Sequence, residues 1–221
     1  MLRTIVIEII KMKKRVFVGG QSLRKVIIYV HGKGASAAEA ERFKKIVPDY
    51  DIVGVDYQEY LPWIVEKQIK EVYDQVRPNY DQVMILANSI GAYFSMLTKG
   101  MKLTKALFIS PLLNMEKYLL NSMEENGISE DELQNKGEIT IGRERFSWQS
   151  LQYVRDHPID WQVPTEILYG ERDDHTSKAV LNEFVQHHNV DVTVMKDGQH
   201  RFHTRPQVAF LDNWLKEKLE K

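Results

Sequence analysis

The sequence predicts a single α/β domain over residues 1–221, with a mostly parallel central sheet, helices on both faces and a small helical lid. Two observations support this prediction. Short apolar runs of strand length alternate with stretches of helical periodicity along most of the chain. The alternation stops over residues 112–162 and resumes at Thr165, which indicates an insertion lying over the carboxyl edge of the sheet.

Composition and charge exclude several classes of function. The formal net charge is −1, so nothing favours nucleic acid or an anionic membrane as a partner. The absence of cysteine excludes disulfides, thiolate metal sites and a cysteine nucleophile. The N-terminus lacks the pattern of a signal peptide, and no apolar run approaches the ~20 residues of a membrane span. We therefore expect a soluble cytoplasmic protein, and a homodimer is possible.

The chain begins with three expected strands and a glycine-rich turn. Residues 4–10 are β-branched and should pair with residues 15–18 in a hairpin. Residues 25–30 form a continuous apolar run, which is typical of a central parallel strand. The turn that follows, His31-Gly32-Lys33-Gly34, should aim backbone N–H groups at whatever lies above the sheet edge.

The next elements are marked by capping residues and proline. Ser36 predicts a helix cap, and Glu39 completes a capping box for a helix over residues 37–47. Residues 51–56 are the next expected strand, and Pro62 opens the second helix.

Ser89 lies between a buried strand and a helix. Residues 82–87 are an apolar run of strand length, and a helical pattern follows the serine as far as Gly100. Strand and helix backbones pass close together at such a turn, so small residues must flank it. Ala87 and Gly91 meet this requirement. The segment therefore predicts a nucleophile elbow, with alanine at the first small position of G-x-S-x-G, and suggests a serine hydrolase.

The lid is expected to be helical. Residues 105–111 form another buried strand, but no strong strand run appears over residues 112–162. The expected lid helices cover residues 115–125, a short segment capped by Ser129, and residues 147–157. Trp148, Tyr153 and Trp161 should pack the lid against the sheet domain.

Two further strands lead to candidate catalytic side chains. Residues 165–169 form a strand followed closely by Asp173, and residues 191–195 form the last strand, followed by His200. Thr204 then begins a capping box for the closing helix, which docks one apolar face on the sheet.

The functional candidates all follow strands, so in a parallel sheet they converge on one edge. The chain resembles the α/β-hydrolase superfamily, and in particular its small serine esterases, from the His31-Gly32 turn to the last helix. The motifs that carry this resemblance are His31-Gly-Lys-Gly34, Ala87-Asn-Ser-Ile-Gly91, Gly170-Glu-Arg-Asp173 and Gly198-Gln-His200.

The resemblance implies a catalytic triad in the chain order Ser, Asp, His. Ser89 would be the nucleophile, His200 the base and Asp173 the acid that orients it. It also implies an oxyanion hole made by the backbone N–H groups of Ile90 and Lys33, supported by His31, Gly32 and Gly91.

Each assignment has an alternative. Ser89 could simply cap the following helix. Asp174 is adjacent to Asp173 and could be the acid, and His203 could replace His200 as the base. A solvated surface role is expected for the four histidines without a motif, which are His157, His175, His187 and His188. The neighbouring His187 and His188 lack the spacing of metal ligands with carboxylates, so we expect no metal site.

The predicted reaction is hydrolysis of a small or medium acyl ester through an acyl-enzyme, with no cofactor. A peptidase, an amidase or a thioesterase would use the same triad, and a non-catalytic binding scaffold is the alternative outside enzymes. Lys33, Arg143 and Arg145 could face the pocket and favour a carboxylate-bearing substrate, or they could be solvated surface residues.

Overall fold

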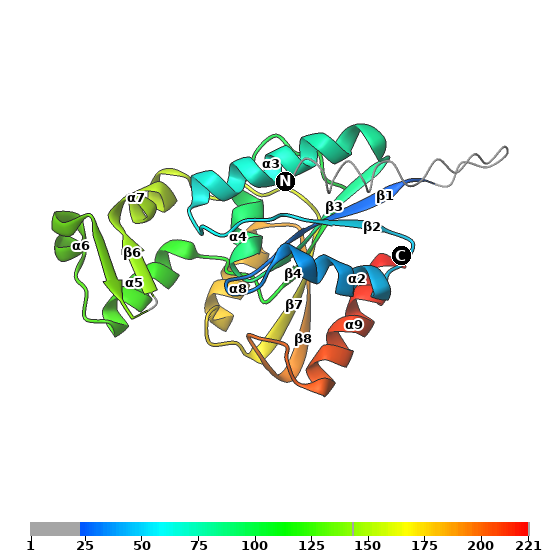
Figure 1. The fold of residues 1–221 in the computed structure, drawn as a ribbon. Coiled ribbons are helices and arrows are strands. Elements are labelled where there is room, and N and C mark those ends of the chain that lie inside the picture. The colour runs from blue at the N-terminus through cyan, green and yellow to red at the C-terminus, as the bar shows by residue number, and fades with distance from the viewer. Residues whose placement is uncertain (1–22, 143, 221) are drawn as a thin grey trace.

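The computed structural model describes residues 23–142 and 144–220 (Figure 1). Its centre is a six-stranded sheet in the order β2-β1-β3-β4-β7-β8, in which every neighbouring pair is parallel. The strands are β1 (Lys25–Val30), β2 (Asp51–Gly54), β3 (Gln82–Asn88), β4 (Lys105–Ile109), β7 (Thr165–Arg172) and β8 (Val190–Gln199). The predicted parallel sheet is confirmed. The hairpin predicted over residues 4–18 lies outside the described residues.

Helices cover both faces of this sheet because successive strand side chains point to opposite faces. The helices are α2 (Ala40–Ile46), α3 (Pro62–Val76), α4 (Ile90–Leu97), α8 (Lys178–His187) and α9 (Arg205–Leu219). Val26 and Ile28 of β1 belong to the apolar cluster that includes α3, α4 and α8, whereas Ile27 and Tyr29 belong to the cluster that includes α2 and α9. A fully buried aliphatic side chain such as Ile28 contributes about 1.5–3 kcal/mol.

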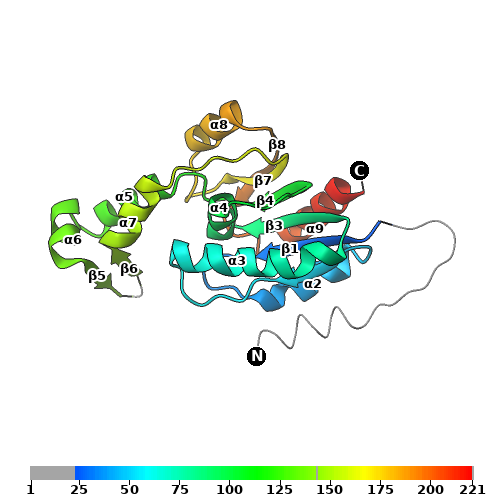
Figure 2. The same ribbon diagram turned by 90° about the horizontal axis from the view of Figure 1, so that it is seen from above.

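The lid contains a β-hairpin between its helices, and it extends beyond the sheet in both views (Figures 1 and 2). It consists of α5 (Met115–Glu125), α6 (Glu130–Lys136), β5 (Glu138–Ile141), β6 (Glu144–Ser147) and α7 (Trp148–Asp156). β5 and β6 pair antiparallel, so the lid contains a hairpin in addition to the expected helices. These strands are four residues each, and Phe146 is their one buried residue, so they leave no apolar run in the sequence.

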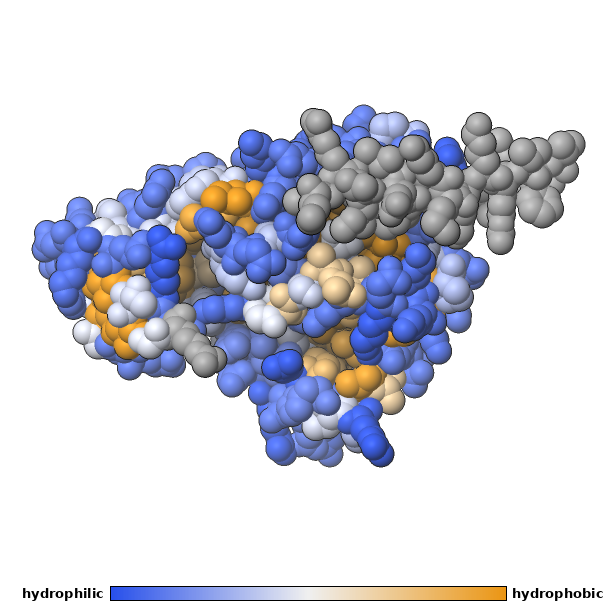
Figure 3. Space-filling view, viewed as in Figure 1, coloured by the Kyte–Doolittle hydropathy of each residue, from blue (hydrophilic) through white to orange (hydrophobic). Residues whose placement is uncertain are grey.

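Aromatic side chains attach the lid to the sheet domain. Tyr153 packs on Trp63 of α3, with ring centroids 5.3 Å apart, and Trp161 packs on Phe108 of β4 at 5.7 Å. Trp148 instead packs into the lid's own core, which consists of Met123, Ile128, Leu133, Phe146 and Leu151. Apolar side chains also gather on the outer surface of the lid, while polar side chains cover most of the rest of that face (Figure 3).

The predicted capping boxes have different outcomes. Ser36 makes no capping hydrogen bond, and α2 is preceded by a 3-10 turn, η1 (Ala37–Glu39). Glu39 instead accepts a hydrogen bond from the Tyr29 hydroxyl, so a contact with the sheet replaces the predicted local one. The Thr204–Gln207 capping box is confirmed at the start of α9. Within the described ranges, no helix has the length and apolarity needed to cross a membrane.

Candidate active site

Ser89 occupies the turn between β3 and α4 in a backbone conformation that side chains rarely adopt. Its φ is 53° and its ψ is −119°, and a non-glycine residue there costs on the order of 1–3 kcal/mol. Backbone hydrogen bonds to β4 and the segment after it hold the residue in place, from Ser89 N to Ile109 O (3.0 Å) and from Leu112 N to Ser89 O (3.1 Å). The Ser89 side chain makes no capping bond to α4, so the capping alternative is wrong.

Small residues around the elbow are required by close backbone contacts. A Cβ atom on Gly91 would lie 2.3 Å from the Val30 carbonyl oxygen and 2.6 Å from that of His31. These distances are far below van der Waals contact, so a side chain at this position would force α4 away from β1. Ala87 is fully buried, and its methyl group fits within the core on the α3 and α4 side of the sheet.

The structure brings Ser89, His200 and Asp173 into one hydrogen-bonded chain. Ser89 Oγ lies 2.9 Å from His200 Nε2, and His200 Nδ1 lies 2.9 Å from both carboxylate oxygens of Asp173. A carboxylate can only accept, so Nδ1 carries the proton and Nε2 accepts from the serine hydroxyl. The Asp173 side chain is fully buried and that of His200 is 12% exposed.

The turn from Asp173 to Thr176 holds the carboxylate in its charged form. Burial raises the pKa of Asp173, whereas the hydrogen bond and the charge of His200 lower it. The backbone N–H groups of His175 and Thr176 add to this by donating to Oδ1, each at 2.9 Å, and the pKa is held below its usual range. The carboxylate that contacts His200 is that of Asp173, whereas Asp174 is exposed.

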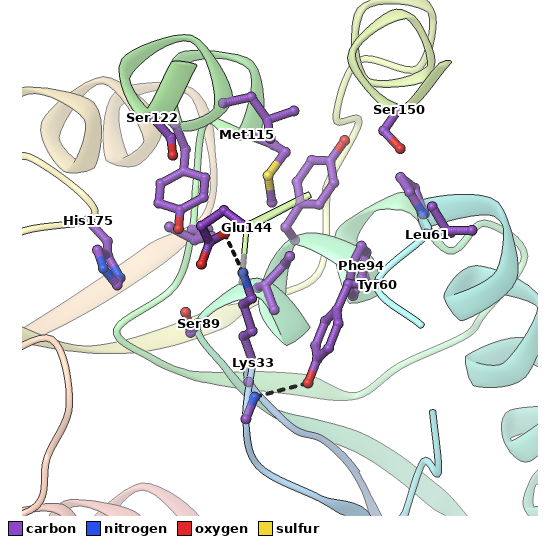
Figure 4. Close-up of a pocket in the computed structure, with 18 of the residues that line it drawn as sticks. Lys33, Tyr60, Leu61, Ser89, Phe94, Met115, Ser122, Glu144, Ser150 and His175 are labelled. Carbon is purple, nitrogen blue, oxygen red and sulfur yellow. Dashed lines mark hydrogen bonds and ion pairs between the residues drawn. The ribbon is translucent and has the colours of Figure 1, made fainter. Parts of the chain in front are cut away.

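The first turn of α4 and the turn after β1 border the serine. Ile90 is the first residue of α4, and an N–H group at that position has no partner within its helix. The turn after β1 runs beside the elbow, since a Cβ on Gly32 would lie 3.4 Å from Ser89 Cβ. Two contacts hold this turn: Gly34 N donates to the Tyr60 hydroxyl (3.0 Å), and Lys33 Nζ pairs with Glu144 of the lid (2.6 Å; Figure 4).

The other histidines of this edge differ in their surroundings. His31 is fully buried, stacks on Tyr57 with centroids 3.9 Å apart, and has Nδ1 2.9 Å from Gly32 O, so it supports the turn. His203 is exposed, and its Nδ1 contacts Arg201 O at 2.7 Å. His203 therefore has a local partner of its own, and His200 contacts the serine.

His175 is exposed, as the sequence interpretation expects, but it is also a site residue. Its ring lies against His200, with centroids 4.0 Å apart, and it lines the same cavity as Ser89 (Figure 4). The one signal in the sequence is its position two residues after Asp173, which does not reveal the direction of its side chain.

A cavity of about 620 Å³ opens above Ser89, between the sheet edge and the lid. Much of its wall is aromatic or aliphatic, including Phe94, Leu112 and Met115. Figure 4 shows Phe94 and Met115 across from His175. Arg145 lines the cavity but pairs with Glu138 at 2.6 Å, and Lys33 is paired as well. Arg143 lies outside the described residues.

Solved structures with similar folds include esterases and a lipase, although the sequence matches no family model and no curated protein. Est1E from Butyrivibrio proteoclasticus is 12% identical over 90% of this chain and 88% of its own, with a TM-score of 0.72, and one of its structures contains ferulic acid. A monoacylglycerol lipase from Paleococcus ferrophilus is 13% identical over 87% of this chain and 94% of its own, with a TM-score of 0.61. An esterase from Pyrococcus furiosus is 17% identical over 90% of this chain and 81% of its own, with a TM-score of 0.56. This chain therefore has the α/β-hydrolase fold.

Proposed function

We propose that the protein is a serine hydrolase that cleaves small or medium acyl esters, with Ser89 as nucleophile, His200 as base and Asp173 as acid. One observation carries the proposal: the unbroken hydrogen-bonded chain from Ser89 Oγ through His200 to Asp173, at the base of a cavity of about 620 Å³. Esterases and a lipase among the structures with this fold add support.

The proposed reaction has two acyl-transfer steps. Ser89 Oγ attacks the carbonyl carbon of the ester while its proton passes to His200 Nε2. The carbonyl oxygen becomes an oxyanion, which the N–H groups of Ile90 and Lys33 stabilise, each by about 3 kcal/mol. The proton on Nε2 then passes to the alcohol oxygen as the ester bond breaks. Water attacks the acyl-enzyme in the same way and releases the acid.

Asp173 acts through the imidazole. It holds the Nδ1–H tautomer, so that Nε2 is free to accept the serine proton, and its negative charge stabilises the imidazolium that forms. Because the side chain is fully buried, water screens this charge pair little.

The apolar wall of the cavity favours an apolar acyl group. Leu112, Met115 and Phe94 offer surface that an aliphatic or aromatic acyl chain can cover. The cationic side chains Lys33 and Arg145 are already paired with carboxylates, so they give no reason to expect a carboxylate-bearing substrate.

Labelling with a fluorophosphonate tests the nucleophile. Wild-type protein should gain one phosphonyl group, and Ser89→Ala should gain none. Ser122→Ala is the matched control, since this serine lines the cavity outside the hydrogen-bonded chain and should label like wild type. Unreactive wild-type protein, or equal labelling of Ser89→Ala, would support a non-catalytic binding scaffold instead.

A substrate panel then separates the reaction types. It should contain p-nitrophenyl esters of increasing acyl length, acyl thioesters, aminoacyl amides, and methyl ferulate because ferulic acid binds Est1E. We expect the highest kcat/KM for the esters. Faster cleavage of amides or thioesters would make peptidase or thioesterase the better description.

A further inference from the structure

The imidazole of His200 has a second aromatic ring on one of its faces. Its hydrogen bonds to Ser89 and Asp173 lie in the plane of the ring, so they hold the two ring nitrogens in place. Rotation of the ring out of that plane is limited by packing on its faces. The His175 ring supplies such a contact, with centroids 4.0 Å apart and a tilt of 58°.

His175 is itself held from two sides. Its backbone N–H donates to Asp173 Oδ1, so the turn that orients the acid also places this ring. Thr176 anchors the turn, because its Oγ1 donates to Pro111 O at 2.7 Å. On the other side, the Tyr118 ring of α5 packs against His175 at 5.6 Å with an interplanar angle of 72°.

We propose that His175 is a positioning residue for the base: with Tyr118 of the lid behind it, its ring keeps the imidazole of His200 aligned between Ser89 and Asp173. This inference rests on the proposed function of the Ser89, His200 and Asp173 chain. The lid thereby reaches the base through two successive ring contacts, Tyr118 on His175 and His175 on His200, in addition to forming the cavity roof.

The charge of His175 matters because His200 becomes positive during the reaction. The charged or titratable groups around His175 are His200, Asp174, Asp173, Glu125 and the Tyr118 phenol. Partial desolvation of the ring and the proximity of His200 lower the pKa of His175, and the three carboxylates oppose this. A neutral ring at this place covers the imidazole without repelling the imidazolium.

Three substitutions at position 175 separate packing from charge. His175→Ala should lower kcat about tenfold with little change in KM, because a freed base spends less time aligned with the serine. His175→Phe should restore most of kcat, since it keeps a ring over His200. His175→Lys should lower kcat and also lower the acid-limb pKa of kcat/KM, because a fixed positive charge disfavours the imidazolium.

The matched control is His188→Ala. His188 also contacts an aromatic ring, since it stacks on Phe184 with centroids 3.9 Å apart. It lies at the end of α8, outside the cavity. It should keep the wild-type kcat. Tyr118→Ala should lower kcat, as His175→Ala does, and Tyr118→Phe should keep a kcat close to that of wild type.

Proton NMR provides a readout that needs no turnover. The downfield signal of the His200 Nδ1–H should persist in His175→Phe and broaden or vanish in His175→Ala. The pKa of His200 should fall in His175→Lys. If the signal and this pKa stay at wild-type values in all three variants, the inference is overturned, whether or not the protein cleaves esters. If wild-type protein cleaves no substrate and resists labelling while the NMR changes occur, the proposed function fails and the positioning contact stands.

Discussion

Replacing Asp173 with asparagine should disable His200 without displacing it. Asp173 Oδ1 accepts the backbone N–H groups of His175 and Thr176, both at 2.9 Å. The amide of asparagine has one oxygen that accepts and an NH₂ group that only donates. Because only the oxygen can satisfy the two backbone N–H groups, the NH₂ must take the place of Oδ2, which faces His200 Nδ1 at 2.9 Å.

This exchange imposes the wrong tautomer on the base. The retained oxygen also lies 2.9 Å from Nδ1, but it already accepts two backbone N–H groups. The NH₂ therefore donates to Nδ1, and the imidazole carries its proton on Nε2, which faces Ser89 Oγ at 2.9 Å. An Nε2–H cannot take the serine proton. The corresponding change in a serine protease costs about 10⁴-fold. We expect kcat to fall about 10³–10⁴-fold, which corresponds to about 4–5.5 kcal/mol of activation free energy.

Initial rates on the best p-nitrophenyl ester provide the assay, with circular dichroism and urea unfolding to show that the variant is folded. Asp174→Asn is the matched control, since this carboxylate is exposed, and its kcat should stay within about twofold of wild type. A folded Asp173→Asn enzyme that keeps more than about a tenth of kcat would refute the tautomer argument. A severe loss of kcat in Asp174→Asn with a mild loss in Asp173→Asn would identify Asp174 as the acid.

Three further changes probe the base, the elbow and the acid. His200→Ala should lower kcat by several orders of magnitude, whereas His203→Ala should lower it less than about threefold. The reverse order would identify His203 as the base. Gly91→Ala should lower the free energy of unfolding by about 2–4 kcal/mol in urea titrations, because its Cβ would lie 2.3 Å from Val30 O. A loss below about 0.5 kcal/mol would show that β1 and α4 separate easily. His200 and the backbone N–H groups of the turn together outweigh burial and lower the pKa of Asp173 in the folded protein. The charged carboxylate therefore stabilises the fold above the unfolded pKa of about 3.9. This stabilisation is lost as the pH falls through the lower pKa of the folded state. Asp173→Asn should therefore flatten the loss of stability below about pH 4, and parallel wild-type and variant curves would contradict this.

The sheet and the meeting of its strand ends were predictable because both depend on local patterns. Buried parallel strands leave continuous apolar runs, and β1, β3, β4 and β7 are each buried along most of their length. In a parallel sheet the residues after each strand come to one edge, which is why Ser89, Asp173 and His200 could be placed together from their order in the chain.

The lid hairpin and the role of Glu39 were not predictable in the same way. β5 and β6 are short and largely exposed, so their stability comes from pairing with each other and from Phe146, and no run of apolar residues marks them. Glu39 has the spacing of a capping box, yet its carboxylate accepts a hydrogen bond from the Tyr29 hydroxyl of β1. In both places a contact between segments far apart in the chain, or between paired strands, overrides a local signal.

His175 shows where such contacts reach the chemistry. Its backbone belongs to the Asp173 turn and is fixed by local hydrogen bonds, but the direction of its ring depends on Tyr118, 57 positions earlier in the numbering and part of the lid. A change in the lid can therefore alter the base without touching Ser89, His200 or Asp173. Substitutions in α5 should accordingly be assayed for kcat as well as for substrate preference, because a lid that only shaped the cavity would change the preference while leaving the alignment of His200 intact.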